Sequence, residues 1–173
     1  ETYYPDQWAN ALDDASSAVV QNNSWGFTNR QYNSGTSYTS ANLATYSTND
    51  TGLTANATSI DNYVTALNSF QDHGVIVFAV SNTSSYSEPD IQVAMPEIYS
   101  QLAEAWINVV NVDITGSAGN ESYSRKSAPC GSTAKYCVAA DGHYISGALS
   151  YTSGSYFSTS GSTGSSFAAP QVS

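Results

Sequence analysis

Residues 59–80 contain the pattern that most strongly restricts what this chain can fold into. In Ser59–His73 (SIDNYVTALNSFQDH), apolar side chains recur every three or four positions, which predicts a helix with one apolar face. That face consists of Ile60, Val64, Leu67 and Phe70. Ser59 is expected to cap the helix and Gly74 to end it. Val75–Val80 (VIVFAV) follows at once, and such an unbroken apolar run is typical of a central strand in a parallel sheet.

A second helix and strand lie near the start of the sequence. Tyr4–Ala15 is expected to be a helix, because its apolar residues have helical spacing and Pro5 and Asp6 suit its first turn. Ala18–Gln21 is expected to be a buried strand that leads into Ser24-Trp25-Gly26. Helices that alternate with apolar strands indicate the α/β class, in which ligands bind beyond the carboxyl ends of the strands. Ser24-Trp25-Gly26 is therefore a candidate binding segment; the alternative is a strand end with a buried tryptophan.

The other segments have weaker patterns. Phe27–Thr58 is rich in Ser, Thr, Asn, Tyr and Gly and is expected to be a loop that could include a short helix. Met95–Tyr99 is expected to form a loop and helical turn, and Trp106–Asp113 a β-branched strand. Tyr144–Ser160 predicts short antiparallel strands joined by glycine turns.

The composition restricts the kinds of partner. The 173 residues include only 10% charged residues, and the net charge is −10. This charge argues against nucleic acid and anionic membranes as partners, since both are bound through basic residues. No segment approaches the ~20 apolar residues of a membrane span, and any export signal is expected to lie outside this sequence. A surface poor in lysine and rich in hydroxyl groups favours a secreted or cell-surface protein.

The segment Gly164–Pro170 (GSSFAAP) suggests a nucleophile. It places Ser166 after a glycine turn and before small, helix-compatible residues. Backbone N–H groups at the start of a helix are free to stabilise an oxyanion near such a serine. Ala168 excludes the G-x-S-x-G motif of the α/β-hydrolases. The alternative is a Ser/Gly loop followed by a helix that proline interrupts.

Four segments together resemble the subtilases, the family of subtilisin-like serine proteases. Gly164–Pro170 is similar to their G-T-S-x-A-x-P motif, with Ser165 in place of threonine. Gly74–Asn82 resembles G-V-x-x-V-x-A-A-G-N, with Ser81 in place of glycine. Val19–Gly26 (VVQNNSWG) is closest to the V-N-N-S-W-G of the autotransporter branch, and Trp106–Asp113 resembles the W-L-x-V-V-x-V-D of the same branch.

The resemblance implies a fold, an activity and a set of site residues. The expected fold is part of a subtilisin-like α/β structure with three layers and a mostly parallel central sheet. The expected activity is peptide-bond hydrolysis, with Ser166 as nucleophile and the Asn82 side chain as a donor to the oxyanion. A peptide substrate would be bound as an added strand by Ser24, Trp25, Gly26, Ala79, Val80 and Ser81. The Ser81 side chain would crowd the floor of the specificity pocket.

The two cysteines, Cys130 and Cys137, have three possible roles. They could be free thiols, half of a metal site or a disulfide, although no C-x-x-C and no clustered histidines support a metal. Cys130–Ala140 (CGSTAKYCVAA) resembles the cysteine segment of the autotransporter branch, which implies a disulfide. That branch continues with Pro-Gly, whereas this chain has Asp141-Gly142.

Subtilases also need an Asp motif and a His motif, and both lie upstream of the Ser-Trp-Gly strand. His73 and His143 stand in other contexts and are not expected to be the general base. Residues 1–173 are therefore expected to be the C-terminal part of one catalytic domain, inactive alone and partnered by the upstream segment and a peptide or protein substrate. No cofactor and no metal is expected. The alternative is a non-catalytic surface or assembly protein with a degenerate subtilase fold.

Overall fold

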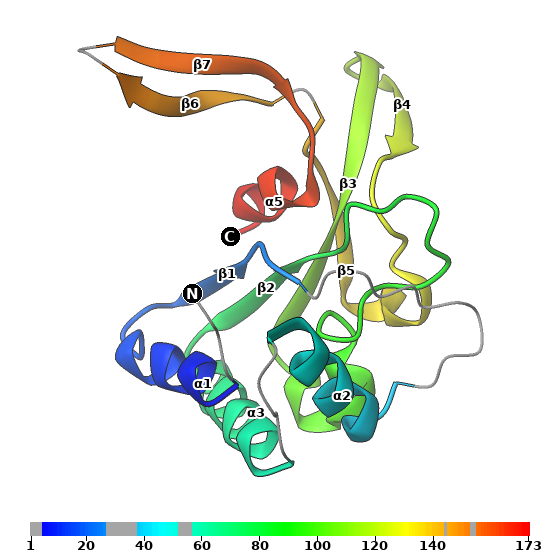
Figure 1. The fold of residues 1–173 in the computed structure, drawn as a ribbon. Helices are drawn as coiled ribbons and strands as arrows, with labels where there is room; N and C mark the ends of the chain where they lie inside the picture. The colour runs from blue at the N-terminus through cyan, green and yellow to red at the C-terminus, as the bar shows by residue number, and fades with distance from the viewer. Residues whose placement is uncertain (1–4, 27–37, 52–56, 144, 153–154) are drawn as a thin grey trace.

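A five-stranded, mostly parallel sheet lies at the centre of the computed structural model (Figure 1). The structure describes residues 5–26, 38–51, 57–143, 145–152 and 155–173. β1 pairs with β2, β2 with β3 and β3 with β5, all in parallel, whereas β4 is antiparallel to β3. The strands are β1 (Val20–Asn23), β2 (Val75–Ala79), β3 (Trp106–Ser117), β4 (Asn120–Arg125) and β5 (Cys137–Asp141). The predicted α/β class is confirmed.

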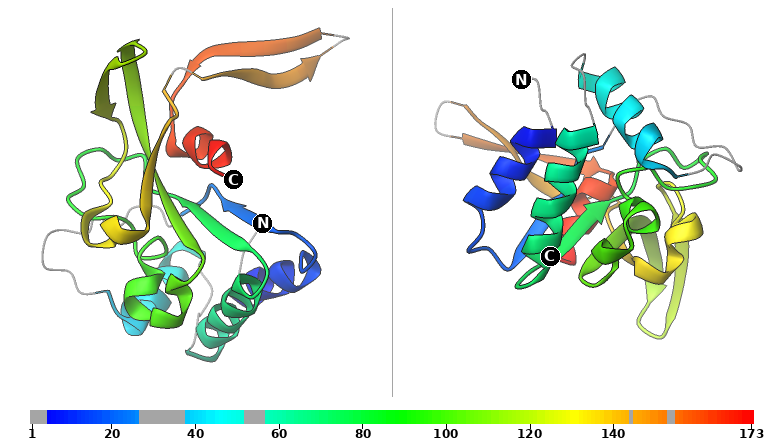
Figure 2. Two further views of the ribbon diagram at one scale, coloured as in Figure 1. Left: turned by 180° about the vertical axis from the view of Figure 1, so that it is seen from behind. Right: turned by 90° about the horizontal axis from the view of Figure 1, so that it is seen from below.

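Helices cover both faces of this sheet and give three layers (Figures 1 and 2). α1 (Pro5–Asp14) and α3 (Ala57–Gln71) pack side by side on one face. The same side carries α2 (Ser40–Thr51), α4 (Met95–Ile98) and the 3₁₀ turn η1 (Ser100–Ala103). α5 (Ser165–Ala168) and the 3₁₀ turn η3 (Ala169–Gln171) lie against the opposite face.

The apolar run of β2 is buried on both faces of the sheet. Ile76, Phe78 and Val80 belong to the larger core, between the sheet and the helices α1 and α3. Val77 and Ala79 belong to a smaller core that α5 and η3 complete. All of these side chains are at most 6% exposed. Burying a large aliphatic or aromatic side chain stabilises a fold by about 1.5–3 kcal/mol, which explains why the sequence of β2 is apolar without alternation.

α3 ends at Gln71, and Gly74, the predicted terminator, allows a close approach of the chain just beyond it. The Gly74 N–H donates to the Phe70 carbonyl at 2.9 Å. A Cβ atom at this position would lie 2.5 Å from Cε1 of Phe70, so any larger residue would displace that core ring. The prediction that Ser59 caps the helix is wrong, because α3 begins at Ala57 and Ser59 is buried within its first turn.

The structure corrects three further expectations. The first strand begins at Val20, and it is not fully buried, because in the described structure it pairs with β2 alone; Val19 is 67% exposed. Within residues 27–58, where a loop that could include a short helix was expected, Ser40–Thr51 forms a helix of 12 residues, α2, while 27–37 and 52–56 lie outside the described residues. β3 continues to Ser117 and turns into β4, a hairpin that the sequence patterns did not indicate.

The two remaining strands form a separate hairpin that leads to α5. β6 (Ile145–Thr152) and β7 (Ser155–Ser162) are antiparallel, which confirms the prediction for residues 144–160 where they are described. Figure 2 shows this hairpin projecting from the body of the molecule. In the part of the chain that the structure describes, no helix combines the length and the apolarity needed to cross a membrane.

Candidate active site

Three segments meet at the edge of the sheet where β1 and β2 end. Because β1 and β2 are parallel neighbours, with Asn23 opposite Phe78, the residues after each strand leave at the same edge. α5 begins beside this edge (Figure 1). Between the segments lies a cleft of about 400 Å³, within the usual range for ligand sites. It is lined by all the residues predicted to be nucleophile, oxyanion donor or substrate-binding: Ser24, Trp25, Gly26, Ala79, Val80, Ser81, Asn82 and Ser166.

The segment after β1 is fixed to the core and to α5. The Trp25 ring lies 4.8 Å from that of Trp8 and 5.7 Å from that of Phe78, and its Nε1 donates to Asn23 Oδ1 at 3.0 Å. The Ser166 hydroxyl donates to the Ser24 carbonyl, and the Ser24 hydroxyl donates to the Ser166 carbonyl, each at 3.4 Å. Contacts across 142 positions of sequence therefore join the two segments.

The Asn82 amide is oriented by Ser165. The backbone N–H of Ser165 donates to Asn82 Oδ1 at 2.7 Å, and the Ser165 hydroxyl lies 3.0 Å from the same oxygen. A backbone N–H can only donate, so Oδ1 must be the atom that faces Ser165, and Nδ2 remains to donate elsewhere. Ser165 is 1% exposed and its hydroxyl also donates to the Val80 carbonyl. Of the two adjacent serines, Ser165 is thus buried with its hydroxyl hydrogen-bonded, whereas Ser166 is only partly buried.

A second donor lies in the first turn of α5. The Phe167 N–H donates to Gly164 and the Ser165 N–H to Asn82. Within the described residues, the N–H of Ser166 has no hydrogen-bond acceptor. This N–H and Asn82 Nδ2 are therefore available at the same cleft as the Ser166 hydroxyl, an arrangement that can stabilise a developing oxyanion. Because α5 is only four residues long, its helix dipole adds little.

Four residues complete the lining of the cleft: Thr83, Tyr86, Asp90 and Ser165. Sequence reasoning assigned none of them a place there. Asp90 is 3% exposed, and burial raises the pKa of its carboxyl from an ordinary 3.8 to about 7. Hydrogen bonds from the backbone N–H groups of Ser81 and of Asp90 itself act in the opposite direction on this pKa. In the sequence, Pro89-Asp90 is typical of an exposed turn, so no local signal could have revealed a buried carboxyl.

Neither histidine contacts Ser166. His73 follows α3 at the amino end of β2, with its ring 5.1 Å from that of Phe70, so it lies at the opposite end of the strand from the cleft. His143 Nδ1 lies 2.9 Å from Thr163 Oγ1, and its Nε2 lies 3.6 Å from the Asp113 carboxylate. These contacts place His143 between β3 and the segment before α5. The described residues therefore give Ser166 no hydrogen bond to an imidazole.

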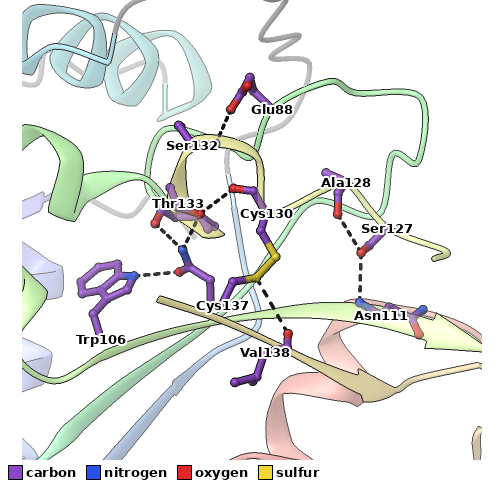
Figure 3. Close-up of a disulfide and its surroundings, with 12 residues drawn as sticks. Glu88, Trp106, Asn111, Ser127, Ala128, Cys130, Ser132, Thr133, Cys137 and Val138 are labelled. Carbon is purple, nitrogen blue, oxygen red and sulfur yellow. Dashed lines mark hydrogen bonds between the residues drawn. A yellow bond between two sulfur atoms is a disulfide. The ribbon is translucent and has the colours of Figure 1, made fainter. Parts of the chain in front are cut away.

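Cys130 and Cys137 form a disulfide, with their Cα atoms 6.1 Å apart (Figure 3). The bridge closes the 3₁₀ turn η2 (Gly131–Tyr136) immediately before β5. Inside this loop, the Thr133 hydroxyl donates to the Cys130 carbonyl at 2.8 Å. The same hydroxyl accepts from Asn108 Nδ2 at 3.0 Å, which attaches the loop to the buried part of β3.

The disulfide loop also holds the segment 88–93, which contains Asp90. The Ser132 N–H donates to a Glu88 carboxylate oxygen at 2.8 Å (Figure 3). Asn108 Nδ2, already bound to Thr133, donates to the Val93 carbonyl at 3.1 Å. Both ends of the segment are thus attached to the loop or to its partner on β3. The disulfide is more than a local link before β5, because it supports one wall of the cleft.

Replacing both cysteines by alanine is expected to destabilise the protein by about 2.5 kcal/mol, the chain-entropy value for so short a loop. The loss should appear as a lower denaturation midpoint. Reduction of the wild type should reproduce it, and reduction of the alanine variant should have no effect. Equal stability of the oxidised and reduced wild type would contradict this prediction.

Comparison with known proteins indicates a family and a fold. The model of the Subtilase family (Peptidase_S8) matches residues 3–173. The structure of PatG macrocyclase in complex with peptide is similar at a TM-score of 0.58, with 19% identity over 99% of this chain and 40% of that one. The structure of the prenylagaramide maturation protease PagA gives a TM-score of 0.54, with 17% identity over 98% of this chain and 46% of that one. This chain thus spans less than half of either solved chain. No curated protein matches the sequence.

Proposed function

The chain belongs to the subtilase family, and on that premise we propose that it forms part of a serine endopeptidase. We infer further that it is the C-terminal part of the catalytic domain, of the autotransporter type. The Ser24-Trp25-Gly26 segment and the cysteine segment support that branch. The solved structures are more than twice as long as this chain, which supports a catalytic domain with further segments.

In the proposed reaction, the Ser166 oxygen attacks the carbonyl carbon of the scissile peptide bond. Its proton passes to a histidine from the upstream segment, which an upstream aspartate orients, and then to the leaving amine as the C–N bond breaks. Water hydrolyses the resulting acyl-enzyme. Asn82 Nδ2 and the Ser166 N–H would hold the oxyanion, while the segments 24–26 and 79–81 bind the peptide as an added strand.

One observation carries this proposal. Ser166 and Asn82, on different elements and far apart in the sequence, line the same cleft as both candidate peptide-binding segments. Ser165 fixes the Asn82 amide so that its nitrogen is the free donor. A non-catalytic protein would not require the Asn82 nitrogen to be free as a donor. The non-catalytic alternative is therefore less well supported.

A fluorophosphonate probe, which reacts only with an activated serine, tests the proposal. We expect the full-length protein to be labelled at Ser166 and the isolated chain of 173 residues to be labelled far more slowly, since a serine hydroxyl without a base is a weak nucleophile. Circular dichroism should first show that the isolated chain is folded. Rapid labelling of that chain would mean that it contains a base. No labelling of the full-length protein would favour the non-catalytic alternative.

We also propose that the protein acts outside the cytosol, as a secreted or cell-surface enzyme. The disulfide supports this location, because structural disulfides persist mainly in oxidising compartments. Mass spectrometry of the protein from its native source, alkylated before reduction, would test it. Free Cys130 and Cys137 thiols would contradict the proposal.

A further inference from the structure

The cleft contains a buried carboxylate for which the proposed chemistry has no use. Asp90 is 3% exposed and lines the cleft together with Ser81 and Asn82. Its carboxyl accepts the backbone N–H of Ser81, the residue directly before the proposed oxyanion donor. The carboxyl therefore lies beside the place where the carbonyl group of a substrate would be held.

The position of Asp90 is fixed from several sides. The Glu88 carboxylate accepts the Ser132 N–H, the Pro89 carbonyl accepts the Tyr38 hydroxyl at 2.9 Å, and the Val93 carbonyl accepts Asn108 Nδ2. A carboxylate held in place in this way does not need to be reorganised when a ligand binds, which favours selective recognition.

No cation in the described structure balances Asp90. None of the residues that line the cleft is basic. Of the described cationic side chains, Lys126 pairs with Asp113, Lys135 pairs with Glu97, and Arg125 binds the carbonyls of Ser84 and Ser127. A buried carboxylate is costly unless a positive charge or sufficient hydrogen bonds compensate it. A cation supplied by a ligand would provide this compensation.

A second buried polar side chain, Gln92, lies beside the cleft and lacks a hydrogen-bond partner. Gln92 is 1% exposed, and neither its Oε1 nor its Nε2 has a hydrogen-bond partner. A Cβ atom on Gly26 would collide with Gln92 Nε2, so the amide lies directly behind a residue that lines the cleft. Asp90 and Gln92 thus place a carboxylate and an unsatisfied amide on one turn next to the proposed peptide-binding strand.

We propose that Asp90 determines substrate specificity and selects peptides with a lysine or arginine immediately before the cleaved bond. This inference rests on the proposed function. The carbonyl of that substrate residue would lie between Ser166 and Asn82, so its side chain is the one nearest Ser81 and Asp90. A guanidinium or ammonium group there would form a charge-assisted hydrogen bond with the carboxylate. This hydrogen bond would offset the unfavourable burial of the carboxylate only when the substrate is basic, which makes the site selective.

The test uses the full-length protein and four peptides that differ only in the residue before the cleaved bond: lysine, arginine, leucine or alanine. Wild type is expected to cleave the lysine and arginine peptides with kcat/KM about 10- to 100-fold above the leucine peptide, the range for a hydrogen bond to a charged group. Asp90→Asn should abolish this preference, so that kcat/KM for the lysine and arginine peptides comes within about 3-fold of the value for the leucine peptide. Asp14→Asn, an exposed change on α1, should leave the preference intact.

Two further measurements separate the possible failures. Fluorophosphonate labelling of Ser166 should be the same in wild type and Asp90→Asn; a labelled wild type without a preference for basic residues would overturn the inference and leave the proposed function standing. An unlabelled wild type would overturn both. If Asp90→Asn does not fold, benzamidine should still inhibit the wild type at least about 10-fold more strongly than its uncharged isostere benzamide, and equal inhibition would overturn the inference.

Discussion

Replacing Ser166 by alanine in the full-length protein is expected to lower the turnover of peptide substrates by about 10⁴- to 10⁶-fold. Alanine removes the atom that would form the acyl-enzyme and leaves the oxyanion donors and the peptide-binding segments in place. The loss should therefore appear in kcat, with KM changed little. Steady-state kinetics on a quenched fluorescent peptide measure it, and the fluorophosphonate probe should no longer label the protein.

The neighbouring serine provides an internal comparison. Ser165→Ala removes a buried hydroxyl and should cost about 1–3 kcal/mol of stability, but Ser166 should still be labelled, because the Ser165 backbone N–H continues to hold Asn82. Ser122→Ala, an exposed change on β4, is the control for a serine-to-alanine substitution as such. Full activity of Ser166→Ala, or loss of labelling in Ser165→Ala alone, would mean that the nucleophile has been assigned to the wrong serine.

Replacing Asn82 by alanine is expected to lower kcat by about 10²- to 10³-fold, the loss measured in subtilisin when a side-chain oxyanion donor is removed. The physical reason is that the Nδ2 hydrogen bond is strongest when the carbonyl oxygen becomes negatively charged. Such an interaction stabilises the transition state more than the bound substrate, so KM should remain nearly constant. The measurement is kcat and KM at several pH values, to exclude a shift of the pH optimum.

An isosteric variant tests whether Asn82 acts as a donor. Asn82→Asp keeps the oxygen that accepts the Ser165 N–H, but it removes the NH₂ group and adds a negative charge where the oxyanion would form. It should lower kcat at least as far as Asn82→Ala, with a melting temperature close to that of wild type. Asn120→Ala, on exposed β4, is the matched control. If Asn82→Asp retains wild-type kcat, Asn82 does not donate to the oxyanion.

The fold was predictable where the signal is local. The apolar side chains of α3 and the uninterrupted β2 mark one helix and one buried strand whatever surrounds them, and the repeated helix–strand order indicates a parallel sheet. Local sequence patterns did not predict the structure or the burial of segments that depend on contacts with distant residues. Ser40–Thr51 has no strong apolar periodicity and forms α2 by packing against α3. The exposure of Val19 and Val20 depends on which strands pair with β1.

By itself, the sequence determined the α/β class, the order of the helix–strand units and the residues expected to line one cleft. Only the tertiary structure decided which of two adjacent serines is buried and which atom of Asn82 is free to donate. It alone also placed Asp90 in the same cleft as Asn82 and Ser166. The physical reason is that apolar periodicity and turn chemistry act over a few residues. Burial of a polar group depends instead on atoms brought together from distant segments: Asn82 and Ser165 are 83 positions apart, and Glu88 and Ser132 are 44 apart.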